Sequence, residues 1–306
     1  MAGFDWDSLK TFLAVARTGR LTAAAQRLGA DHTTISRRIS GLETSLGASL
    51  FHRAPTGYTL TTHGERLLAT AETMESLSLA AQSEVGEADL KVTGAVRVGA
   101  PEGFGSCFLA PRLGALADRH PELKIELVAI AGLFSLSKRE ADIAIHLSPP
   151  TEGRLVARKL TDYRLGLYGS HAYLAGRPPI ARRADLPAHR FIGYIEDLLQ
   201  SQELDYLRQG ELPIDAQIKS SNLIAQLAAA RAGAGLCVLP HFIAREEPDL
   251  VPVLPGEVSL TRAFWLVTHA DLRNLARVRE TADFIVEETR RAKGAFLGLE
   301  PGAGAY

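Results

Sequence analysis

The stretch LTAAAQRLGADHTTISRRI, residues 21–39, decides the fold of the amino-terminal part of this chain. It holds two short amphipathic helical patterns, separated only by Gly29, Ala30 and Asp31. In the first pattern the residues on one face are Leu21, Ala24, Ala25 and Leu28, and Thr22 is placed to cap the helix start. In the second, the predicted buried stripe is Ile35, Ile39, Leu42 and Leu46. The spacing predicts a helix-turn-helix.

The outward face of the second predicted helix is polar, small and basic. Its members are His32, Thr33, Ser36, Arg37 and Ser40. Hydroxyl and imidazole groups reach base edges in the major groove, while guanidinium groups hold phosphates. The pattern therefore indicates a DNA recognition helix, and the alternative is a solvated helix in a small bundle.

The flanking residues complete a winged helix-turn-helix. Upstream, residues 6–18 place Leu9, Phe12, Leu13 and Ala16 on one helical face. Downstream, residues 50–61 are typical of two short strands around a Pro-Thr-Gly turn. Arg53 is then expected on the wing, beside backbone phosphates, with a plain exposed charge as the alternative.

Five segments resemble the amino-terminal domain of LysR-type transcriptional regulators: Phe12-Leu-Ala-Val-Ala, Leu21-Thr-Ala-Ala-Ala-Gln-Arg-Leu, Thr34-Ile-Ser-Arg-Arg-Ile, Leu42-Glu and Leu50-Phe-His-Arg. The resemblance implies sequence-specific binding of double-stranded operator DNA. Many members of that family have Gln and Pro or Ser where this chain has His32 and Thr33, which leaves the operator preference open. The residues expected at the DNA are Thr22, His32, Thr33, Thr34, Ser36, Arg37, Arg38 and Arg53.

Length, cysteine content and charge agree with a two-domain cytoplasmic protein. A chain of 306 residues exceeds one helix-turn-helix module and leaves room for a larger globular domain. The two cysteines, Cys107 and Cys237, form no disulfide framework or zinc pattern. No signal peptide or apolar run of membrane-spanning length is present, so no membrane partner is expected. Residues 1–64 carry a net charge of +3 and the rest −4, which places the positive charge on the DNA-binding domain.

A dimerising helix is expected after the wing. Residues 63–85 contain no Pro and, after Gly64, no Gly, and an apolar seam is formed by Leu67, Met74, Leu77 and Ala81. The alternative is a helix packed on its own domain. The predicted division is a winged helix-turn-helix over 1–62, a linker helix and hinge over 63–91, an effector domain over 92–295 and a tail over 296–306. We expect a homodimer or a homotetramer, and the sequence leaves this choice open.

The second domain alternates apolar runs with helical patterns. Strands are predicted at 96–99, 125–130, 143–147, 165–168, 191–194, 236–239 and 264–268, and helices at 109–119, 197–207, 223–232 and 272–290. This alternation indicates an α/β fold with a largely parallel sheet, whose ligands bind beyond the carboxyl ends of the strands.

The LysR-type resemblance continues in Pro101-Glu-Gly-Phe-Gly, Ala141-Asp-Ile-Ala-Ile-His-Leu and Ala229-Ala-Arg-Ala-Gly-Ala-Gly-Leu-Cys-Val-Leu-Pro. It implies an effector domain similar to type 2 periplasmic binding proteins, with two α/β lobes and a cleft between them. We expect the chain to cross between lobes near Leu160 and near residues 261–263. Lobe I is then 92–160 with 264–295, and lobe II is 161–263.

A small effector, an organic anion, is expected between the lobes, although Glu102 and Glu196 would repel an anion if they face the same cleft. Ser106 follows Gly105 near one helix start, and Ser220, Ser221 and Asn222 precede another, so their side chains either hold an anion or merely cap the helices. The resemblance also places His146 and Ser148 at the cleft rim, where His146 is alternatively an interior residue with satisfied hydrogen bonds. The full set of expected effector contacts is Pro101, Glu102, Gly103, Phe104, Ser106, His146, Ser148, Ser220, Ser221 and Asn222. A redox role for Cys107 is left open.

Other functional classes fit the sequence less well. No G-x-S-x-G, P-loop or H-E-x-x-H motif occurs, and the nine histidines lack metal-ligand spacing, so catalysis, a cofactor and a metal are not expected. A solute-binding protein remains the alternative for the second domain. The sequence indicates a ligand-responsive transcriptional regulator, for which RNA polymerase is a further candidate partner, while the effector, the target genes and the sign of regulation stay open.

Overall fold

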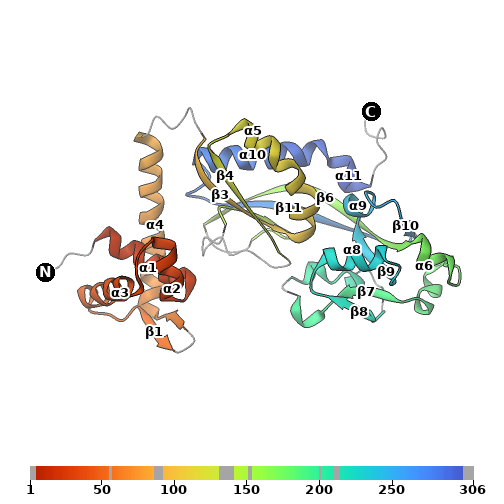
Figure 1. The fold of residues 1–306 in the computed structure, drawn as a ribbon, viewed down its shortest axis with the longest axis horizontal. Coiled ribbons are helices and arrows are strands. Elements are labelled where there is room, and N and C mark those ends of the chain that lie inside the picture. The colour runs from red at the N-terminus through yellow and green to blue at the C-terminus, as the bar shows by residue number, and fades with distance from the viewer. Residues whose placement is uncertain are drawn as a thin grey trace. The chain divides into compact units, whose positions relative to one another are not determined.

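The computed structural model describes residues 5–54, 57–85, 92–130, 141–150, 154–199, 201–209, 212 and 214–298. The chain divides into two compact units, Met1–Ala88 and Asp89–Tyr306. Figure 1 shows the helices of the first unit in red and orange, and the sheet of the second in yellow to blue.

The amino-terminal unit consists of four helices and a hairpin. The helices are α1 (Trp6–Thr18), α2 (Leu21–Leu28), α3 (His32–Leu46) and α4 (Thr62–Val85), and the strands β1 (Phe51–Ala54) and β2 (Gly57–Leu60) pair antiparallel. Glycines in the left-handed conformation end the first three helices: Gly19, Gly29 and Gly47 have φ of 64°, 61° and 63°. Glycine adopts this conformation without a steric penalty, so the helices end where the sequence predicts.

The core of this unit is made by the predicted apolar faces. Leu9, Phe12, Ile35, Ile39 and Leu42 are at most 2% exposed. They pack with Leu50 and Phe51 from the start of the hairpin. The three helices and the hairpin therefore share one small core, as a winged helix-turn-helix requires.

Two local expectations in this unit are wrong. Thr22 does not cap α2, because the helix already begins at Leu21 and the extended residue before it is Arg20, whose side chain makes no capping hydrogen bond. Leu46 is 41% exposed instead of buried. It is the last residue of α3, and the chain turns away at Gly47 before that position reaches the core.

The first turns of α4 pack on the amino-terminal core. Leu67 and Leu68 contact the core cluster and Ala71 is fully buried. A Cβ at Gly64 would lie 2.2 Å from the backbone oxygen of Leu50, so only glycine permits this close approach. Of the expected dimer seam, Leu67 thus packs on its own unit, Met74 is 38% exposed, and the side chains of Leu77 and Ala81 lie outside the described residues.

The second unit is built on one mixed sheet. Its strands are β3 (Gly94–Pro101), β4 (Leu123–Ile130), β5 (Ile143–His146), β6 (Leu155–Ser170), β7 (Phe191–Tyr194), β8 (Ile218–Ser220), β9 (Leu236–Pro240), β10 (Leu250–Val253) and β11 (Ser259–His269). The sheet order is β4-β3-β5-β11-β6-β9-β7-β8, and β10 pairs with β6.

Parallel pairing is confined to the two ends of this sheet. β3 runs parallel to β4 and β5, and β7 runs parallel to β8 and β9. The central strands β6 and β11 are antiparallel to each other and to the strands beside them. The expectation of a largely parallel sheet is therefore too simple. Figure 1 shows β6 and β11 running from the β3–β4 group to the β7–β9 group.

A register shift lies in the middle of these two long strands. Phe264 pairs with Thr161, but Trp265 pairs with Lys159, so Leu160 is the extra residue. Such a bulge bends a strand pair and increases its local twist. The bend is at Leu160, close to where we expect the chain to pass between lobes.

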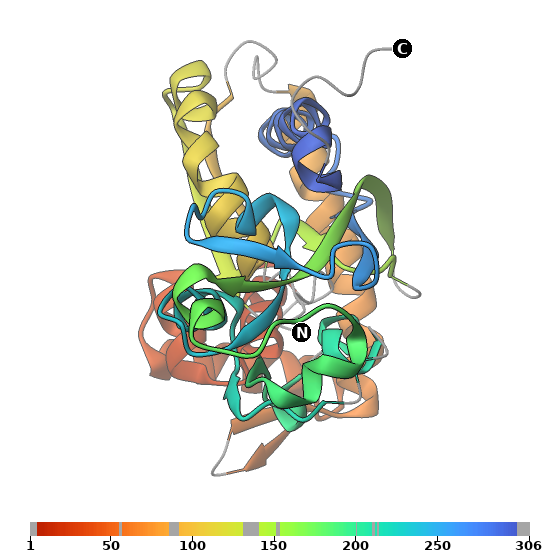
Figure 2. The same cartoon turned by 90° about the vertical axis from the view of Figure 1, so that its right-hand side faces the viewer.

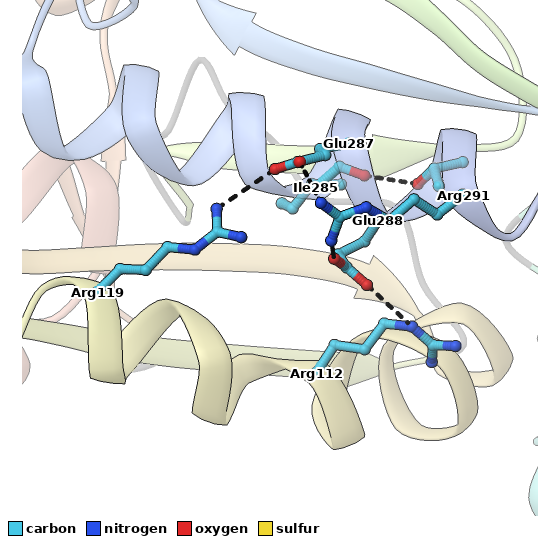
Figure 3. A network of polar contacts seen from close by, with 7 residues as sticks. Arg112, Arg119, Ile285, Glu287, Glu288 and Arg291 are labelled. Atoms are coloured by element: carbon cyan, nitrogen blue, oxygen red, sulfur yellow. Dashed lines mark hydrogen bonds and ion pairs between the residues drawn. The ribbon is translucent and has the colours of Figure 1, made fainter.

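The helices of the second unit are α5 (Leu113–Arg119), α6 (His171–Ala175), α7 (Tyr206–Gln209), α8 (Leu223–Arg231), α9 (His241–Ala244), α10 (Ala276–Arg291) and α11 (Lys293–Leu297). Figures 1 and 2 show α5 and α10 beside each other over the β3–β4 end of the sheet. An ion pair from Arg119 to Glu287 at 3.3 Å joins α5 to α10, and Arg112, in the turn just before α5, pairs with Glu288 at 3.5 Å (Figure 3).

The helix expected over 197–207 is broken. It consists of two 3₁₀ turns, Glu196–Leu198 and Gln202–Leu204, followed by α7. Ser201 hydrogen-bonds Glu203, and Asp205 accepts from the backbone N–H of Arg208. A side chain that bonds the local backbone, as Asp205 does, favours a turn over a continuous helix. The helix expected over 109–119 likewise starts as a π-helical turn, Phe104–Leu109, and a 3₁₀ turn containing Pro111.

The expected tail contains a core residue. Phe296 in α11 is fully buried and its ring lies 4.7 Å from that of Phe242 and 4.8 Å from that of Phe108. A tail boundary at residue 296 is therefore wrong, because this aromatic side chain anchors the chain to the sheet unit. The residues after 298 lie outside the described part.

Candidate DNA interface and effector pocket

The amino terminus of α3 presents the polar face expected from the sequence. His32, Thr33, Arg37 and Arg38 are exposed, and Thr34 and Ser36 are half-buried. Asp31 caps the helix: its carboxylate accepts from the backbone N–H of Thr34 at 2.7 Å and from the Thr34 hydroxyl at 2.7 Å. The Thr33 hydroxyl also bonds Asp31. These hydrogen bonds hold the pKa of Asp31 well below its usual range, so the cap stays ionised.

Because Asp31 binds the two threonine hydroxyls, the exposed side chains of this face that can still offer hydrogen-bond donors to DNA are His32, Arg37 and Arg38. The Thr33 and Thr34 hydroxyls are engaged with Asp31, which leaves their methyl groups for apolar contact. Thr22, expected at the DNA, lies in the first turn of α2 and is exposed.

Arg53 lies within β1, next to the wing turn. Its guanidinium pairs with Glu43 of α3 at 2.8 Å and hydrogen-bonds Ser40 at 3.4 Å. Glu43 in turn accepts from the backbone N–H of Leu50 at 2.8 Å. The side chain is still 49% exposed. Arg53 therefore fixes the hairpin against α3, and a phosphate contact would have to share this cation with Glu43.

A pocket in the second unit lies at the carboxyl ends of the strands. It spans about 580 Å³ of space free of atoms, a volume that includes open solvent. Its walls come from the ends of β3, β4, β5, β7 and β9, and from the long strands β6 and β11. The lining residues are Pro101, Glu102, Gly103, Phe104, Ile130, Ile145, His146, Leu147, Tyr163, Tyr194, Ser201, Leu204, Tyr206, Leu223, Pro240, Phe242 and Phe264.

Three tyrosines supply most of the hydroxyl groups of this lining. The Tyr206 side chain hydrogen-bonds those of Tyr163 and Tyr194. Burial raises the pKa of Tyr206 to about 12 and the pKa values of Tyr163 and Tyr194 well above their ordinary value. All three remain neutral phenols, which donate and accept hydrogen bonds. Tyr163 also stacks on Phe264, with ring centres 4.1 Å apart.

Glu102 is the acid of the pocket, and it is held by α8. Its carboxylate accepts from the backbone N–H of Leu223 at 3.0 Å and also bonds the N–H of Ile224. Burial raises the pKa of this carboxyl group, and the two backbone hydrogen bonds oppose that shift. Gly103 permits the contact, because a Cβ there would lie 2.7 Å from the Leu223 side chain.

The structure brings together half of the expected effector residues. Pro101, Glu102, Gly103, Phe104 and His146 line the pocket, whereas Ser106, Ser148, Ser220, Ser221 and Asn222 are not among its lining residues. Ser106 is exposed on the π-helical turn. Asn222 caps α8 by accepting from the backbone N–H of Ala225 at 2.7 Å, and the Ser220 hydroxyl accepts from the Asn222 N–H at 3.2 Å. These helix-start groups therefore bond to backbone, which is the capping alternative.

The expectation missed the aromatic lining. Tyr194, Pro240 and Leu147 lie at the carboxyl ends of predicted strands, so the rule for ligands in α/β folds points to them. Tyr163 and Phe264 lie on the long central strands, whose extent the apolar runs did not reveal. Tyr206 begins α7, after the two 3₁₀ turns, and no local sequence pattern marks it as a pocket residue.

Cys107 is a half-buried free thiol whose surroundings disfavour the thiolate. Burial raises the pKa of its thiol, and the nearby acids Glu102 and Glu247 raise it further. Burial also raises the pKa of Cys237. Thiolates, not thiols, react with oxidants and alkylating agents.

We therefore expect Cys107 in a Cys237→Ser protein to react with iodoacetamide at neutral pH more slowly than free cysteine. Its rate should rise only above the ordinary thiol pKa of about 8.5. The same protein unfolded in urea is the control, because its thiol is solvated. A native rate at pH 7 that matches the unfolded rate would contradict the raised pKa.

The described residues contain no cluster of His, Cys, Asp or Glu arranged to hold a metal ion. Within the same residues, no helix combines the length and apolarity needed to span a membrane.

Two family descriptions match the chain. "Bacterial regulatory helix-turn-helix protein, lysR family" matches residues 6–65, and "LysR substrate binding domain" matches residues 91–290. The HTH-type transcriptional regulator PtxR of Pseudomonas aeruginosa is 30% identical over 254 residues, covering 81% of each chain. CrgA of Neisseria meningitidis is 26% identical over 287 residues, covering 92% of this chain and 96% of that protein.

Solved structures show the same fold. A full-length OxyR variant from Pseudomonas aeruginosa superposes with a TM-score of 0.73 at 17% identity, covering 95% of this chain and 96% of that chain. CrgA from Neisseria meningitidis superposes with a TM-score of 0.57 at 24% identity, covering 94% and 99%.

Proposed function

The chain belongs to the LysR family of DNA-binding transcriptional regulators, and on that basis we propose that it binds operator DNA through α3 as a homodimer and responds to a small molecule in the pocket. It is a regulator with an effector-binding domain, not an enzyme. The observation that carries the proposal is the exposed face of α3, where His32, Arg37 and Arg38 extend from a helix fixed by its own core.

The face of α3 separates two kinds of contact. His32 and Thr33 are in the first turn of the helix, where recognition helices meet base edges. Arg37 and Arg38 are one turn later, and Arg53 is on the hairpin. In this proposal the first-turn residues read sequence, while the arginines, Thr22, Thr34 and Ser36 hold the sugar-phosphate backbone. RNA polymerase is a further proposed partner. We also propose a cytoplasmic location, because the DNA that the protein would bind is there.

His32→Ala should relax the preference among operator variants by about 1–3 kcal/mol at one base pair, because a base contact is lost. Arg38→Ala should instead weaken binding to all sequences alike and lower the dependence of log K on log salt by about one unit. Fluorescence anisotropy on a panel of operator variants, repeated at several salt concentrations, measures both effects. Thr44→Ala, an exposed change at the far end of α3, is the control.

If His32→Ala weakened the affinity for every operator variant by the same factor, His32 would contact the phosphates and not a base. Arg53→Ala gives a second check: because Arg53 is already paired with Glu43, its salt effect should be smaller than that of Arg38→Ala.

The pocket is the proposed effector site. Its walls join the two ends of the mixed sheet, so a ligand that contacts both would change how they bend about Leu160. We propose the lobes as 92–160 with 264–298 and 161–263, which moves the carboxyl boundary beyond Phe296. By linkage, a ligand that changes operator affinity has its own affinity changed by operator DNA through the same factor, typically 1–3 kcal/mol.

Footprinting of the DNA that flanks this chain's own gene tests the regulatory function. Protection of two half-sites about one helical turn or a multiple apart would support a dimeric regulator. A single unpaired site, or no protection at protein concentrations that saturate nonspecific binding, would count against it. A secreted solute-binding role has no support from the structure, because the DNA-binding unit is folded in the same chain.

A further inference from the structure

The pocket differs chemically from the anion site that the sequence suggested. Its described lining is mostly apolar, with six aromatic rings: Phe104, Tyr163, Tyr194, Tyr206, Phe242 and Phe264. Among the described residues that line it, none is a lysine or an arginine. The polar groups are the Glu102 carboxylate, the His146 ring, the Ser201 hydroxyl and the three phenols.

One of the two helix starts that were expected to hold an anion, that of α8, already binds a carboxylate of the protein itself. Glu102 accepts the backbone N–H groups of Leu223 and Ile224 at the first turn of α8. Asn222 takes the N–H of Ala225. The donors that would attract a ligand carboxylate are thus used, and the group that faces the pocket beside them is itself a carboxylate.

We propose that the effector is a small, largely apolar molecule, aromatic or alicyclic, whose hydrogen-bond donor group binds Glu102, and that the site prefers such a donor to an organic anion. The donor is an ammonium or a neutral hydroxyl, of which the ammonium binds more tightly. This inference rests on the proposed function and specifies the ligand class of its pocket.

Physical chemistry sets the order of affinities. A carboxylate accepts up to about four hydrogen bonds, so the two from α8 leave room for a ligand donor. A hydrogen bond between charged groups contributes about twice the free energy of one between neutral groups, so an ammonium should bind Glu102 more tightly than a hydroxyl does. A ligand carboxylate would meet Glu102 as a like charge, and the described lining residues include no lysine or arginine to compensate, although Arg262 lies close enough to act on Tyr163 and Tyr206. The aromatic walls favour the apolar body and, where a ring face meets it, the cation.

The test uses trios of probes. The three compounds of a trio share the same apolar scaffold and differ only in the polar group, which is an amine, an alcohol or a carboxylate. Phenethylamine, phenethyl alcohol and hydrocinnamate form the first trio, and the corresponding indolyl and cyclohexyl compounds form two more. Binding to the full chain is measured by calorimetry at neutral pH. In the tightest trio we expect the amine to bind about tenfold more tightly than the alcohol and the carboxylate to bind weakest.

Glu102→Gln identifies the group responsible. The amide oxygen can still accept from Leu223, so α8 keeps its partner and the fold should persist. We expect the amine to lose about tenfold in affinity and the alcohol less than about threefold. Glu246→Gln, an acid whose side chain is 76% exposed and lies outside the lining, should change neither.

Three results would overturn the inference: a carboxylate that binds as tightly as its amine, an amine preference that survives Glu102→Gln, or no binding by any trio at millimolar concentration. The regulatory function is tested apart from this, by the effect of a bound amine on operator affinity. An amine that binds through Glu102 without changing operator affinity would leave the ligand class standing and reject the regulatory role of the pocket.

Discussion

Replacing Arg17 by alanine should destabilise the amino-terminal unit by about 3 kcal/mol. The guanidinium of Arg17, in α1, holds Glu75 of α4 through two hydrogen bonds, of 2.7 and 3.3 Å, and lies 3.9 Å from Glu72. Its side chain is only 6% exposed, and those of Glu72 and Glu75 are 18% and 22% exposed. Removing the cation takes this partner from two mostly buried carboxylates one helical turn apart, Glu72 and Glu75, which repel each other. Loss of one partner from a buried pair costs more than the pair itself contributes.

Urea unfolding followed by tryptophan fluorescence measures this effect. Trp6 reports on the first unit once the second tryptophan, Trp265, is replaced by phenylalanine. Lys10→Ala is the matched control, since Lys10 pairs with Asp7 at 3.7 Å on the surface, where both side chains are about half exposed or more. That pair should contribute less than about 1 kcal/mol. If Arg17→Ala unfolds at the same urea concentration as Lys10→Ala, the packing of α4 on α1 does not depend on this pair.

The amino-terminal unit could be predicted almost to the residue because its signals are local. Apolar side chains recur at helical spacing, and Gly19, Gly29 and Gly47 stand where helices must end in a left-handed turn. The errors came from end effects. Thr22 looks like a cap, but α2 starts one residue earlier, and Leu46 continues the stripe although the helix ends there.

The centre of the second unit could not be predicted, because its long strands are only partly marked by apolar residues. Only Leu165–Tyr168 of β6 reads as an apolar run, while its first half carries Arg158, Lys159 and Asp162. Those residues are exposed or half-buried, so no apolar alternation marks them. The pairing of β6 with β11 joins residues about 100 positions apart, which no local pattern shows.

The pocket was half predicted for the same reason. Residues 101–104 and His146 directly follow or end apolar runs, so both the family resemblance and the strand rule point to them. The identity of the ligand class was not predictable, because it depends on Glu102 reaching the start of α8 across 121 positions of sequence. With that contact known, Asn222 and Ser220 are seen to bond to backbone N–H groups.

Replacing Leu77 by glutamate should abolish the dimer and lower operator affinity by about 100-fold or more. Two half-sites about 34 Å apart are held together only if the protein is a rigid dimer, and losing one of two linked contacts typically costs a factor of 10² to 10⁴. Leu77 lies in α4, although its side chain is outside the described residues. The described part of the seam supports the choice: Met74, one turn earlier, is an apolar side chain that is 38% exposed.

The two faces of α4 make the experiment specific. Gly64, Leu68 and Ala71 pack on the unit's own core, and Glu75 pairs with Arg17. On a helical wheel, Met74 and Leu77 fall on a different side, so a charge at Leu77 should leave the packed face intact. Ser76→Glu, opposite the seam on the wheel, is the control and should remain dimeric. Sedimentation velocity and anisotropy on the same samples give both readouts. A Leu77→Glu protein that sediments as a dimer and binds its operator normally would place the dimer contact elsewhere in the chain.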